Sequence, residues 1–340
     1  MEPVIHHDKT LILEDGIELK SRIWSPKTNG PWPTLLMRQP YGREIASTLT
    51  YVHPSWFAQH GFLVVIQDVR GQGGSSGDFS GFSQEASDTT QTLNWVRSLP
   101  ECNGKLGTYG FSYQGLTQLL ATPESIPPDC FVPAMTGLDE GNHWSCEGGA
   151  FWWHIGLAWG LQLAAQRAKR NQNINGWIEI RESLENGSYL RRGPELLKKY
   201  DPQGMAIKWL NASHQCKKDW TIHKPLKSWL KKPILLIGGW WDPHLRGLID
   251  IYHQSLSAGG SPEIHIGPAS HLEWWEGTHL LHLNFFNRYL KNSKDLDFDS
   301  PKNYLWNLTS NNWEKYKNNY SELPYWGLKS NGASCVEGLD

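Results

Sequence analysis

The sequence predicts an α/β fold in which a mostly parallel sheet is flanked by helices and carries an inserted helical segment. In the first part of the chain, short apolar runs bounded by turn residues alternate with helical segments. Such alternation is typical of parallel strands that helices cover on both faces. Over 142–229 the residues predict helices rich in Trp, Lys, Arg and Asn, and strand patterns return after 230. The helical stretch therefore interrupts one α/β unit.

The first predicted element is a β-hairpin. Residues 10–13 and 17–25 have strand composition, and Glu14, Asp15 and Gly16 separate them. An Asp-Gly pair supplies the positive φ values that a tight turn requires. We therefore expect an antiparallel edge of the sheet here.

Buried strands and covering helices follow in order. The strands are apolar runs between turn residues, and the helices have apolar residues at helical spacing. We predict strands at 34–38, 62–66, 105–109, 233–237, 263–266 and 304–308, and helices at 54–60, 84–99, 116–121 and 280–290.

The length of 340 residues exceeds that of a usual single-core domain. We expect the interruption to be a cap inserted into one core, and the polar, Asn-rich end to be a separate tail. The predicted division is 1–141 for the first part of the core, 142–229 for the helical cap, 230–292 for the second part of the core and 293–340 for the tail.

The charge and hydropathy of the sequence indicate which kinds of partner the protein binds. Lys and Arg number 32 against 34 Asp and Glu, for a formal charge of -2, so electrostatics favours neither nucleic acid nor a membrane as partner. There is no secretory signal pattern and no apolar run of the ~20 residues that would cross a bilayer. We expect a soluble, cytoplasmic protein that acts on a small molecule. The five cysteines contain no CxxC pair, which argues against a disulfide framework or a zinc ribbon.

The strongest chemical signal is the run Gly110-Phe111-Ser112-Tyr113-Gln114-Gly115, which lies between a predicted strand and a predicted helix. A sharp strand-to-helix turn of this kind lifts a serine hydroxyl above the sheet as a nucleophile. The glycine spacing is GxSxxG, one residue longer than the commoner GxSxG. The alternative is an ordinary serine in a strand-to-helix loop.

A serine nucleophile requires a base and an acid that orients the base, in the chain order Ser, Asp, His. Asp242 follows the predicted strand at 233–237, and His271 follows the next one at 263–266. The oxyanion hole should use the backbone N–H of Tyr113 and a second donor after the strand at 34–38. Tyr41 lies there, with an ordinary loop tyrosine as the alternative.

Five motifs in order resemble the family of Xaa-Pro dipeptidyl peptidases and cocaine esterase, which includes glutaryl acylases and α-amino-acid ester hydrolases. The resemblance spans about 5–290 and implies an α/β-hydrolase fold. It also implies Ser112, Asp242 and His271 as the triad and the Tyr41 phenol as an oxyanion donor. The family usually carries a C-terminal jelly roll, of which only 302–313 looks like a first strand, so we expect this domain to be largely missing. The motifs are Arg38-Gln39-Pro40-Tyr41-Gly42, Gln67-Asp68-Val69-Arg70-Gly71-Gln72-Gly73-Gly74-Ser75, Gly110-Phe111-Ser112-Tyr113, Gly238-Gly239-Trp240-Trp241-Asp242 and Gly267-Pro268-Ala269-Ser270-His271.

Other residues carry weaker signals. Most of the 19 tryptophans should be core residues, but four that flank the expected triad could line a substrate pocket. Asp68 and Arg70 lie in a Gly-rich loop that lacks the lysine and spacing of a phosphate loop, and we expect them to pair near the site. The four candidate pocket residues are Trp240, Trp241, Trp274 and Trp275.

These residues predict a serine hydrolase that cleaves an ester, amide or short-peptide substrate through an acyl-enzyme, without a metal or organic cofactor. Because no carboxylate cluster is evident for a substrate ammonium, an esterase or acylase is favoured over an Xaa-Pro dipeptidyl peptidase. A non-catalytic binding protein of the same fold stays open. A missing jelly roll would expose an apolar face, which leaves a homo-oligomer open as well.

Overall fold

The computed structural model describes residues 4–45, 51–213, 217–291 and 303–316, and the backbone of 326–328 and 335–337. The strands of the main sheet are β1 (Val4–Ile12), β2 (Glu18–Pro26), β3 (Trp32–Gln39), β4 (Leu63–Asp68), β5 (Cys102–Phe111), β6 (Cys130–Ala134), β9 (Leu235–Trp241), β10 (Glu263–Ser270), β11 (Tyr304–Asn307) and β12 (Asn312–Lys315). Two further pairs are β7 (Cys146–Glu147) with β8 (Ala150–Phe151) and β13 (Trp326–Leu328) with β14 (Cys335–Glu337).

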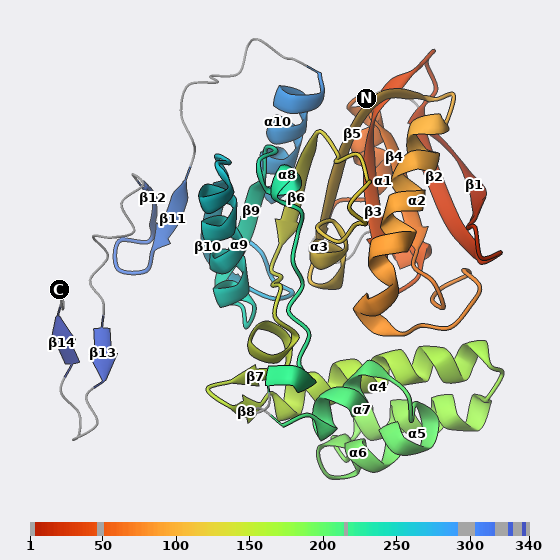
Figure 1. Ribbon diagram of the computed structural model, residues 1–340, viewed down its shortest axis with the longest axis vertical. Coiled ribbons are helices and arrows are strands. Elements are labelled where there is room, and N and C mark those ends of the chain that lie inside the picture. Colours follow the sequence, from red (N-terminus) through yellow and green to blue (C-terminus); the bar gives the residue numbers. More distant parts are fainter. Residues whose placement is uncertain are drawn as a thin grey trace.

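The ten strands of the main sheet follow the order β1-β2-β4-β3-β5-β6-β9-β10-β11-β12 (Figure 1). Neighbours are parallel from β4 to β11, while β1, β2 and β12 pair antiparallel at the two edges. The predicted mostly parallel sheet and its antiparallel N-terminal hairpin are therefore confirmed. Residues 303–313, expected in part as a first strand of another domain, form β11 and the start of β12, and β11 pairs with β10 of this sheet.

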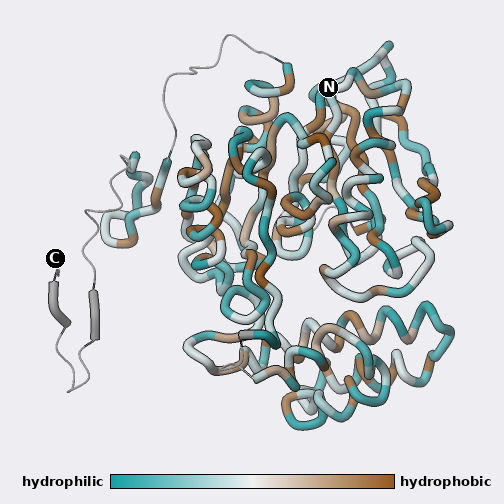
Figure 2. Tube along the Cα trace, viewed as in Figure 1, coloured by the Kyte–Doolittle hydropathy of each residue, from teal (hydrophilic) through white to brown (hydrophobic). Residues whose placement is uncertain are grey.

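Helices cover both faces of the sheet. Consecutive residues Leu35 and Leu36 of β3 enter different hydrophobic cores, because side chains of a strand alternate between its two faces. Figure 2 shows apolar residues along the inner strands, as expected for strands buried on both sides. One core contains residues of α1 (Pro54–Gln59) and α10 (Thr278–Leu290); the other contains residues of α2 (Glu85–Ser98), α3 (Tyr113–Thr117), α8 (Lys227–Leu230) and α9 (Leu245–Ala258).

Four helices lie together beyond the ends of the central strands (Figure 1). They enclose a small apolar core of their own, which includes Leu157, Leu161 and Leu197. The predicted helical character of this stretch is confirmed, while its limits at 142 and 229 stay a prediction. The helices are α4 (Trp153–Arg170), α5 (Ile174–Glu185), α6 (Tyr189–Tyr200) and α7 (Met205–Asn211); short helical turns elsewhere are η1 (Arg43–Ile45), η2 (Gly81–Gln84), η3 (Glu140–Ser145) and η4 (Lys217–Asp219).

The strand β6 and the helix α9 have no counterpart among the predicted elements. β6 contains Pro133, and a proline argues against a central strand because it cannot donate to the ladder. The strands β9 and β10 are longer than predicted. Asp242 and His271 consequently follow their strands directly, without an intervening loop.

The expected pairing of Asp68 with Arg70 is wrong. Asp68 pairs with Arg43 (2.8 Å) and also accepts the Gly74 N–H at 2.8 Å, so the loop and Arg43 occupy its carboxylate. Arg70 instead pairs with Asp88 of α2 at 2.7 Å. The two charged residues therefore tie the loop to different neighbours.

The helices of the described residues bear on membrane insertion, and their cysteines on disulfide formation. No helix in the described ranges combines the length and apolar character needed to span a bilayer. Cys102, Cys130 and Cys146 carry free thiols. Burial raises the pKa of the Cys130 thiol well above its ordinary value, which keeps this thiol protonated.

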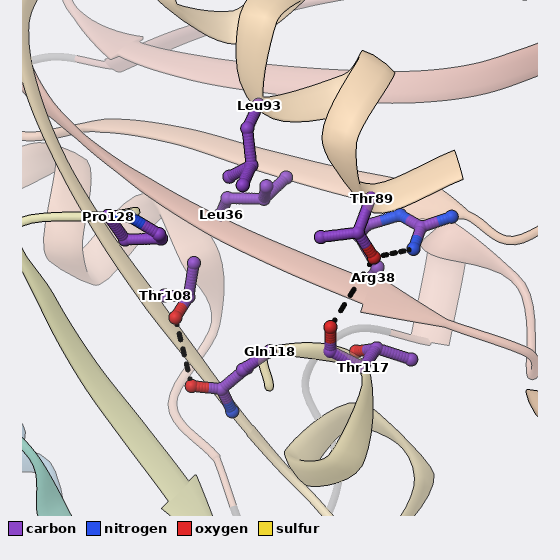
Figure 3. Close-up of a pocket in the computed structure, with 8 residues that line it drawn as sticks. All are labelled: Leu36, Arg38, Thr89, Leu93, Thr108, Thr117, Gln118 and Pro128. Atoms are coloured by element: carbon purple, nitrogen blue, oxygen red, sulfur yellow. Dashed lines mark hydrogen bonds between the residues drawn. The ribbon is translucent and has the colours of Figure 1, made fainter. Parts of the chain in front are cut away.

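A buried ionic network joins β3 to α2 and α3 beneath the end of β5. Arg38 Nη1 donates to Glu85 Oε2 at 2.5 Å. It also donates to Thr89 Oγ1 at 2.6 Å (Figure 3). The Tyr113 hydroxyl donates to Glu85 Oε1 at 2.8 Å and to the Gly81 carbonyl at 3.0 Å. Burial raises the pKa of Glu85, and Arg38 and Tyr113 oppose that rise. The network thereby connects the residue after Ser112 to the sheet.

A cavity of about 10 Å³ lies beside this network and is lined by residues that include Leu36, Thr108 and Pro128 (Figure 3). Its volume is at the lower limit of the ~10–15 Å³ that one water molecule requires. This cavity is therefore a packing defect of the core and too small for a substrate.

The helix α10 carries a buried histidine, His282, between aromatic rings that include Tyr51 (5.5 Å between centroids) and Phe286 (6.4 Å). Its Nδ1–H donates to the Thr278 carbonyl at 2.7 Å. Its Nε2 is buried, and in the described part of the chain nothing bonds to it. Burial accordingly lowers the pKa of His282 to about 4, and the ring is neutral at pH 7.

We predict that His282→Asn reduces the loss of stability in acid. Between the ordinary pKa of 6.5 and about 4, the unfolded chain takes up a proton that the folded chain excludes. The free energy of unfolding should therefore fall by about 3 kcal/mol on account of His282 as the pH drops through this window. Urea denaturation at pH 7 and pH 4.5 measures the difference, with the exposed His6→Asn as the control. Equal pH dependence in His282→Asn and wild type would contradict the assignment.

We predict that Glu85→Ala costs about 3–5 kcal/mol of folding free energy, because it leaves the Arg38 guanidinium buried without its carboxylate. The double variant Arg38→Leu/Glu85→Leu should recover much of this loss, since it leaves no unpaired charge. Denaturant titration measures both, and Glu195→Ala on the exposed side of α6 is the control. A Glu85→Ala protein as stable as the control would show that the pair is not needed.

Candidate active site

The backbone turns sharply at Ser112, between β5 and α3. Ser112 has φ 58° and ψ -126°, a conformation that costs free energy in a residue with a Cβ. Its N–H donates to the carbonyls of Ala134 (2.9 Å) and Met135 (3.1 Å), and its own carbonyl accepts the N–H groups of Gly115 and Leu116. These bonds hold the strained turn from both sides.

The glycines on either side explain the GxSxxG spacing. A Cβ on Gly110 would lie 2.4 Å from the Gln114 Cβ, and a Cβ on Gly115 would lie 2.8 Å from the Thr136 Cβ. Gly110 also has φ 146°. Both positions therefore require glycine for close packing, and the longer spacing is compatible with a sharp turn at Ser112.

Asp242 and His271 are brought together across the ends of β9 and β10. His271 Nδ1 lies 2.7 Å from Asp242 Oδ1, and the Asp242 side chain is buried. Since a carboxylate can only accept, the Nδ1–H donates and the Nε2 lone pair is left for proton transfer. The His271 ring packs against Phe111, the residue before Ser112, with 5.3 Å between centroids. The predicted acid, base and nucleophile thus lie at one edge of the sheet.

Tyr41 lies after β3 and is held by the first helix of the helical segment. The Trp159 Nε1–H of α4 donates to the Tyr41 hydroxyl at 3.1 Å, and Tyr41 also hydrogen-bonds Ser112. Desolvation raises the pKa of Tyr41 to about 12, although both of these bonds oppose the rise. The phenol is therefore protonated at pH 7, and its oxygen accepts from Trp159.

Tyr113 is the first residue of α3, where backbone N–H groups have no acceptor within the helix. Its ring is fully buried and stacks on Phe82 (4.5 Å between centroids). The Glu85 network holds its hydroxyl, so the side chain serves as an anchor. The amide is left at the helix N-terminus, beside the Ser112 hydroxyl.

The sequence did not point to His244, which lies two residues after Asp242. Its Nδ1–H donates to the His143 carbonyl at 2.6 Å, and its ring packs against His271 (4.9 Å) and Trp144 (4.6 Å). Burial lowers the pKa of His244 to about 4, so a neutral imidazole lines the site beside His271. In the sequence, the feature that could have indicated His244 is its position two residues after Asp242.

One group of side chains in the described ranges has the composition of a metal site. Ligand atoms of Asp242, His244 and His271 lie within 4.8 Å of one another. Asp242 and His271 are hydrogen-bonded to each other, and His244 is bonded to a backbone carbonyl. Hydrogen bonding thus accounts for the positions of all three groups.

The four candidate pocket tryptophans lie in different surroundings. Trp274 lies beside the site, since its Nε1–H donates to the His271 carbonyl at 3.3 Å and its ring packs on Phe111. Trp241 is 61% exposed. Trp240 donates to the Trp306 carbonyl at 2.7 Å, and Trp275 packs on Trp313 at 5.1 Å, so both fasten β11 and β12 to the sheet.

The chain is similar to known hydrolases over most of its length. It is 25% identical over 339 residues to cocaine esterase from Rhodococcus sp. (strain MB1 Bresler), covering 88% of this chain and 58% of that protein. A CocE/NonD family hydrolase from Staphylococcus aureus has the same fold, with a TM-score of 0.70 and 18% identity over 92% of this chain and 56% of that one. An α-amino acid ester hydrolase matches with a TM-score of 0.58 and 20% identity over 92% and 58% of the two chains. This chain therefore has the predicted α/β-hydrolase fold and spans less than two thirds of the length of these relatives.

Family membership follows from a match over most of the sequence. The profile of the X-Pro dipeptidyl-peptidase (S15) family matches residues 15–273. This range includes Tyr41, Ser112, Asp242 and His271, and it agrees with the resemblance drawn from the five motifs. The chain belongs to the X-Pro dipeptidyl-peptidase (S15) family.

Proposed function

We propose that this protein is a serine hydrolase that cleaves carboxylic esters or amides through an acyl-enzyme. The observation that carries the proposal is the 2.7 Å bond between His271 Nδ1 and Asp242 Oδ1, at the edge of the sheet where the strained Ser112 lies. An aspartate that accepts from Nδ1 fixes the tautomer in which Nε2 is a base. Without a reactive serine nearby, this orientation would have no evident use.

In the proposed reaction, His271 Nε2 takes the proton of the Ser112 hydroxyl while Ser112 Oγ attacks the substrate carbonyl carbon. Asp242 stabilises the imidazolium that forms. The resulting oxyanion accepts hydrogen bonds from the Tyr41 hydroxyl and the Tyr113 amide. His271 then protonates the leaving alcohol or amine as its bond to carbon breaks, and water, activated by His271, releases the acid and restores Ser112.

The Tyr41 phenol is suited to this role by its surroundings. A pKa of about 12 keeps the proton on the oxygen throughout the neutral range. The bond from Trp159 fixes the position of the oxygen before substrate arrives. A donor that is already oriented needs no reorganisation when the oxyanion forms, which is the condition for electrostatic stabilisation.

An esterase or acylase acting on small molecules is the substrate class that we propose first, with the helices of 142–229 as a cap over the site. A dipeptidyl peptidase is the second candidate, because the family profile that matches 15–273 is named for that activity. A panel of short acyl esters and Xaa-Pro anilides distinguishes the two. A fold that only binds its ligand would turn over neither set.

We predict that Ser112→Ala abolishes covalent labelling by a fluorophosphonate probe and lowers turnover by several orders of magnitude, because no other group in the proposed site replaces the nucleophile. Mass spectrometry of the labelled protein locates the adduct. Ser98→Ala, on the exposed side of α2, is the matched control. Undiminished labelling of Ser112→Ala would refute the nucleophile, and an unlabelled wild type would favour the binding protein.

We predict that Tyr41→Phe lowers kcat by ~10²–10³, about 2.7–4 kcal/mol of transition-state stabilisation, with little change in KM. The variant keeps the ring and its packing but removes the donor. Measuring kcat, KM and Tm on one preparation separates a catalytic from a structural tyrosine. A lower Tm with near-normal kcat would remove Tyr41 from the mechanism.

A further inference from the structure

A cavity of about 560 Å³ opens beside Tyr41, between the loops that follow β3 and β4 and the helices α4 and α5. Its volume lies within the range of small-molecule sites, ~300–1,000 Å³. Tyr41 belongs both to the lining of this cavity and to the proposed oxyanion hole, which places one end of the cavity next to the proposed site. The lining is polar at its other end, where Gln166, Lys169, Arg170 and Arg181 lie.

The helix α4 leads from the reaction centre to this polar end. Trp159, which donates to Tyr41, is followed on the same face by Gln162, Gln166 and Lys169, at helical spacings of three and four residues. Ten residues of helix separate Trp159 from Lys169, a distance of ~15 Å at 1.5 Å per residue. The face therefore runs from the proposed oxyanion hole to Lys169, and the long lysine side chain shortens the span that a substrate has to cover, because helical side chains lean toward the N-terminus of their helix.

Three cationic side chains line the polar end, and two of them lie over the ring of Trp177. Lys169 lies 5.9 Å and Arg181 5.5 Å from the Trp177 ring centroids. Arg181 pairs with Glu185 at 2.6 Å, whereas neither Lys169 nor Arg170 has a carboxylate partner in the part of the chain that the structure describes.

Arg170 is held in place by the core. It donates to the carbonyls of Gly73 (3.0 Å) and Ser75 (2.7 Å), and Asp68 and Asp78 attract its charge without forming an ion pair with it in the described part of the chain. Glu44 also lines the cavity, but its side chain is 74% exposed and lies 3.7 Å from Arg22. Within the described residues, Lys169 therefore offers this end of the cavity a positive charge that is not bonded to a carboxylate.

We propose that this cavity binds a carboxylate at the end of the substrate remote from the scissile bond. This inference rests on the proposed function and names its substrate class: esters or amides that carry a terminal carboxylate. The carboxylate would lie near Lys169 and Arg170, and the apolar stretch of the substrate would lie along α4 and Trp177. The anion could belong to the acyl side, as in a dicarboxylic acid monoester, or to the leaving group.

Matched substrates test the proposal. The p-nitrophenyl monoester of adipic acid and p-nitrophenyl hexanoate differ only in a terminal carboxylate on the acyl side. Hexanoyl 4-hydroxybenzoate and phenyl hexanoate differ in the same way on the leaving side. We expect kcat/KM to be at least about fivefold higher for the anionic member in one arm, as one favourable ion pair of ~1 kcal/mol would give. The arm that shows the preference assigns the side, and no preference in either arm overturns the proposal.

Two variants test whether Lys169 is responsible for the preference for the anionic substrate. Lys169→Gln should remove most of the preference for the anionic substrate, measured as the ratio of kcat/KM for the anionic substrate to kcat/KM for the neutral one. Lys198→Gln makes the same charge change on an exposed position of α6 that does not line the cavity, and should leave the preference intact. A preference that survives Lys169→Gln, or that Lys198→Gln lowers equally, contradicts the assignment.

Binding separates this inference from the proposed function. Calorimetry on the Ser112→Ala protein compares monohexyl adipate with hexyl hexanoate, without turnover. Tighter binding of the anionic ester, reduced by Lys169→Gln, supports the cavity whether or not the wild type hydrolyses esters. Equal binding of the two esters overturns the inference even if the wild type is an active hydrolase. Absence of both probe labelling and ester hydrolysis would instead refute the proposed function.

Discussion

The backbone conformation at Ser112 is the constraint on which the rest of the site depends. A residue with a Cβ stays at φ 58° and ψ -126° only where its surroundings over-determine it. Here the sheet holds the Ser112 N–H, the first turn of α3 holds its carbonyl, and Gly110 and Gly115 allow the approach of both. The buried pair of Arg38 and Glu85 supports this turn from below, because it anchors the ring of Tyr113.

A few hydrogen bonds connect the helical segment to the loops of the core that carry the proposed site. The Trp159 indole of α4 positions the Tyr41 hydroxyl, and Arg170 of the same helix binds carbonyls of the Gly-rich loop. Both contacts use groups with fixed geometry, an indole N–H and a guanidinium. A shift of α4 would therefore move the proposed oxyanion donor and the cationic end of the cavity together.

Much of the fold was predictable because the strands are short apolar runs between turn residues, and because the Asp15-Gly16 turn and Pro100 mark element ends. The prediction failed where a local rule and the tertiary structure disagree. Pro133 lies in a central strand, since its missing N–H is tolerated between β5 and β9. Asp68 and Arg70 are close in sequence, yet each forms an ion pair with another residue. Asp68 pairs with Arg43, and Arg70 pairs with Asp88. Trp240 and Trp275 pack on β11 and β12, a contact that no local pattern encodes.

The α/β class, the chain order of Ser112, Asp242 and His271, and the motifs that mark the family can be read from the amino-acid sequence, because each depends on residue type and near spacing. Which of these groups meet depends on the packing of the folded chain. The bond between His271 and Asp242 joins residues 29 positions apart, and that between Trp159 and Tyr41 joins residues 118 positions apart. The shifted pKa values of Tyr41 and His244 likewise arise from burial. Such contacts depend on how strands and helices pack, and the hydrophobic periodicity of a sequence does not specify that packing.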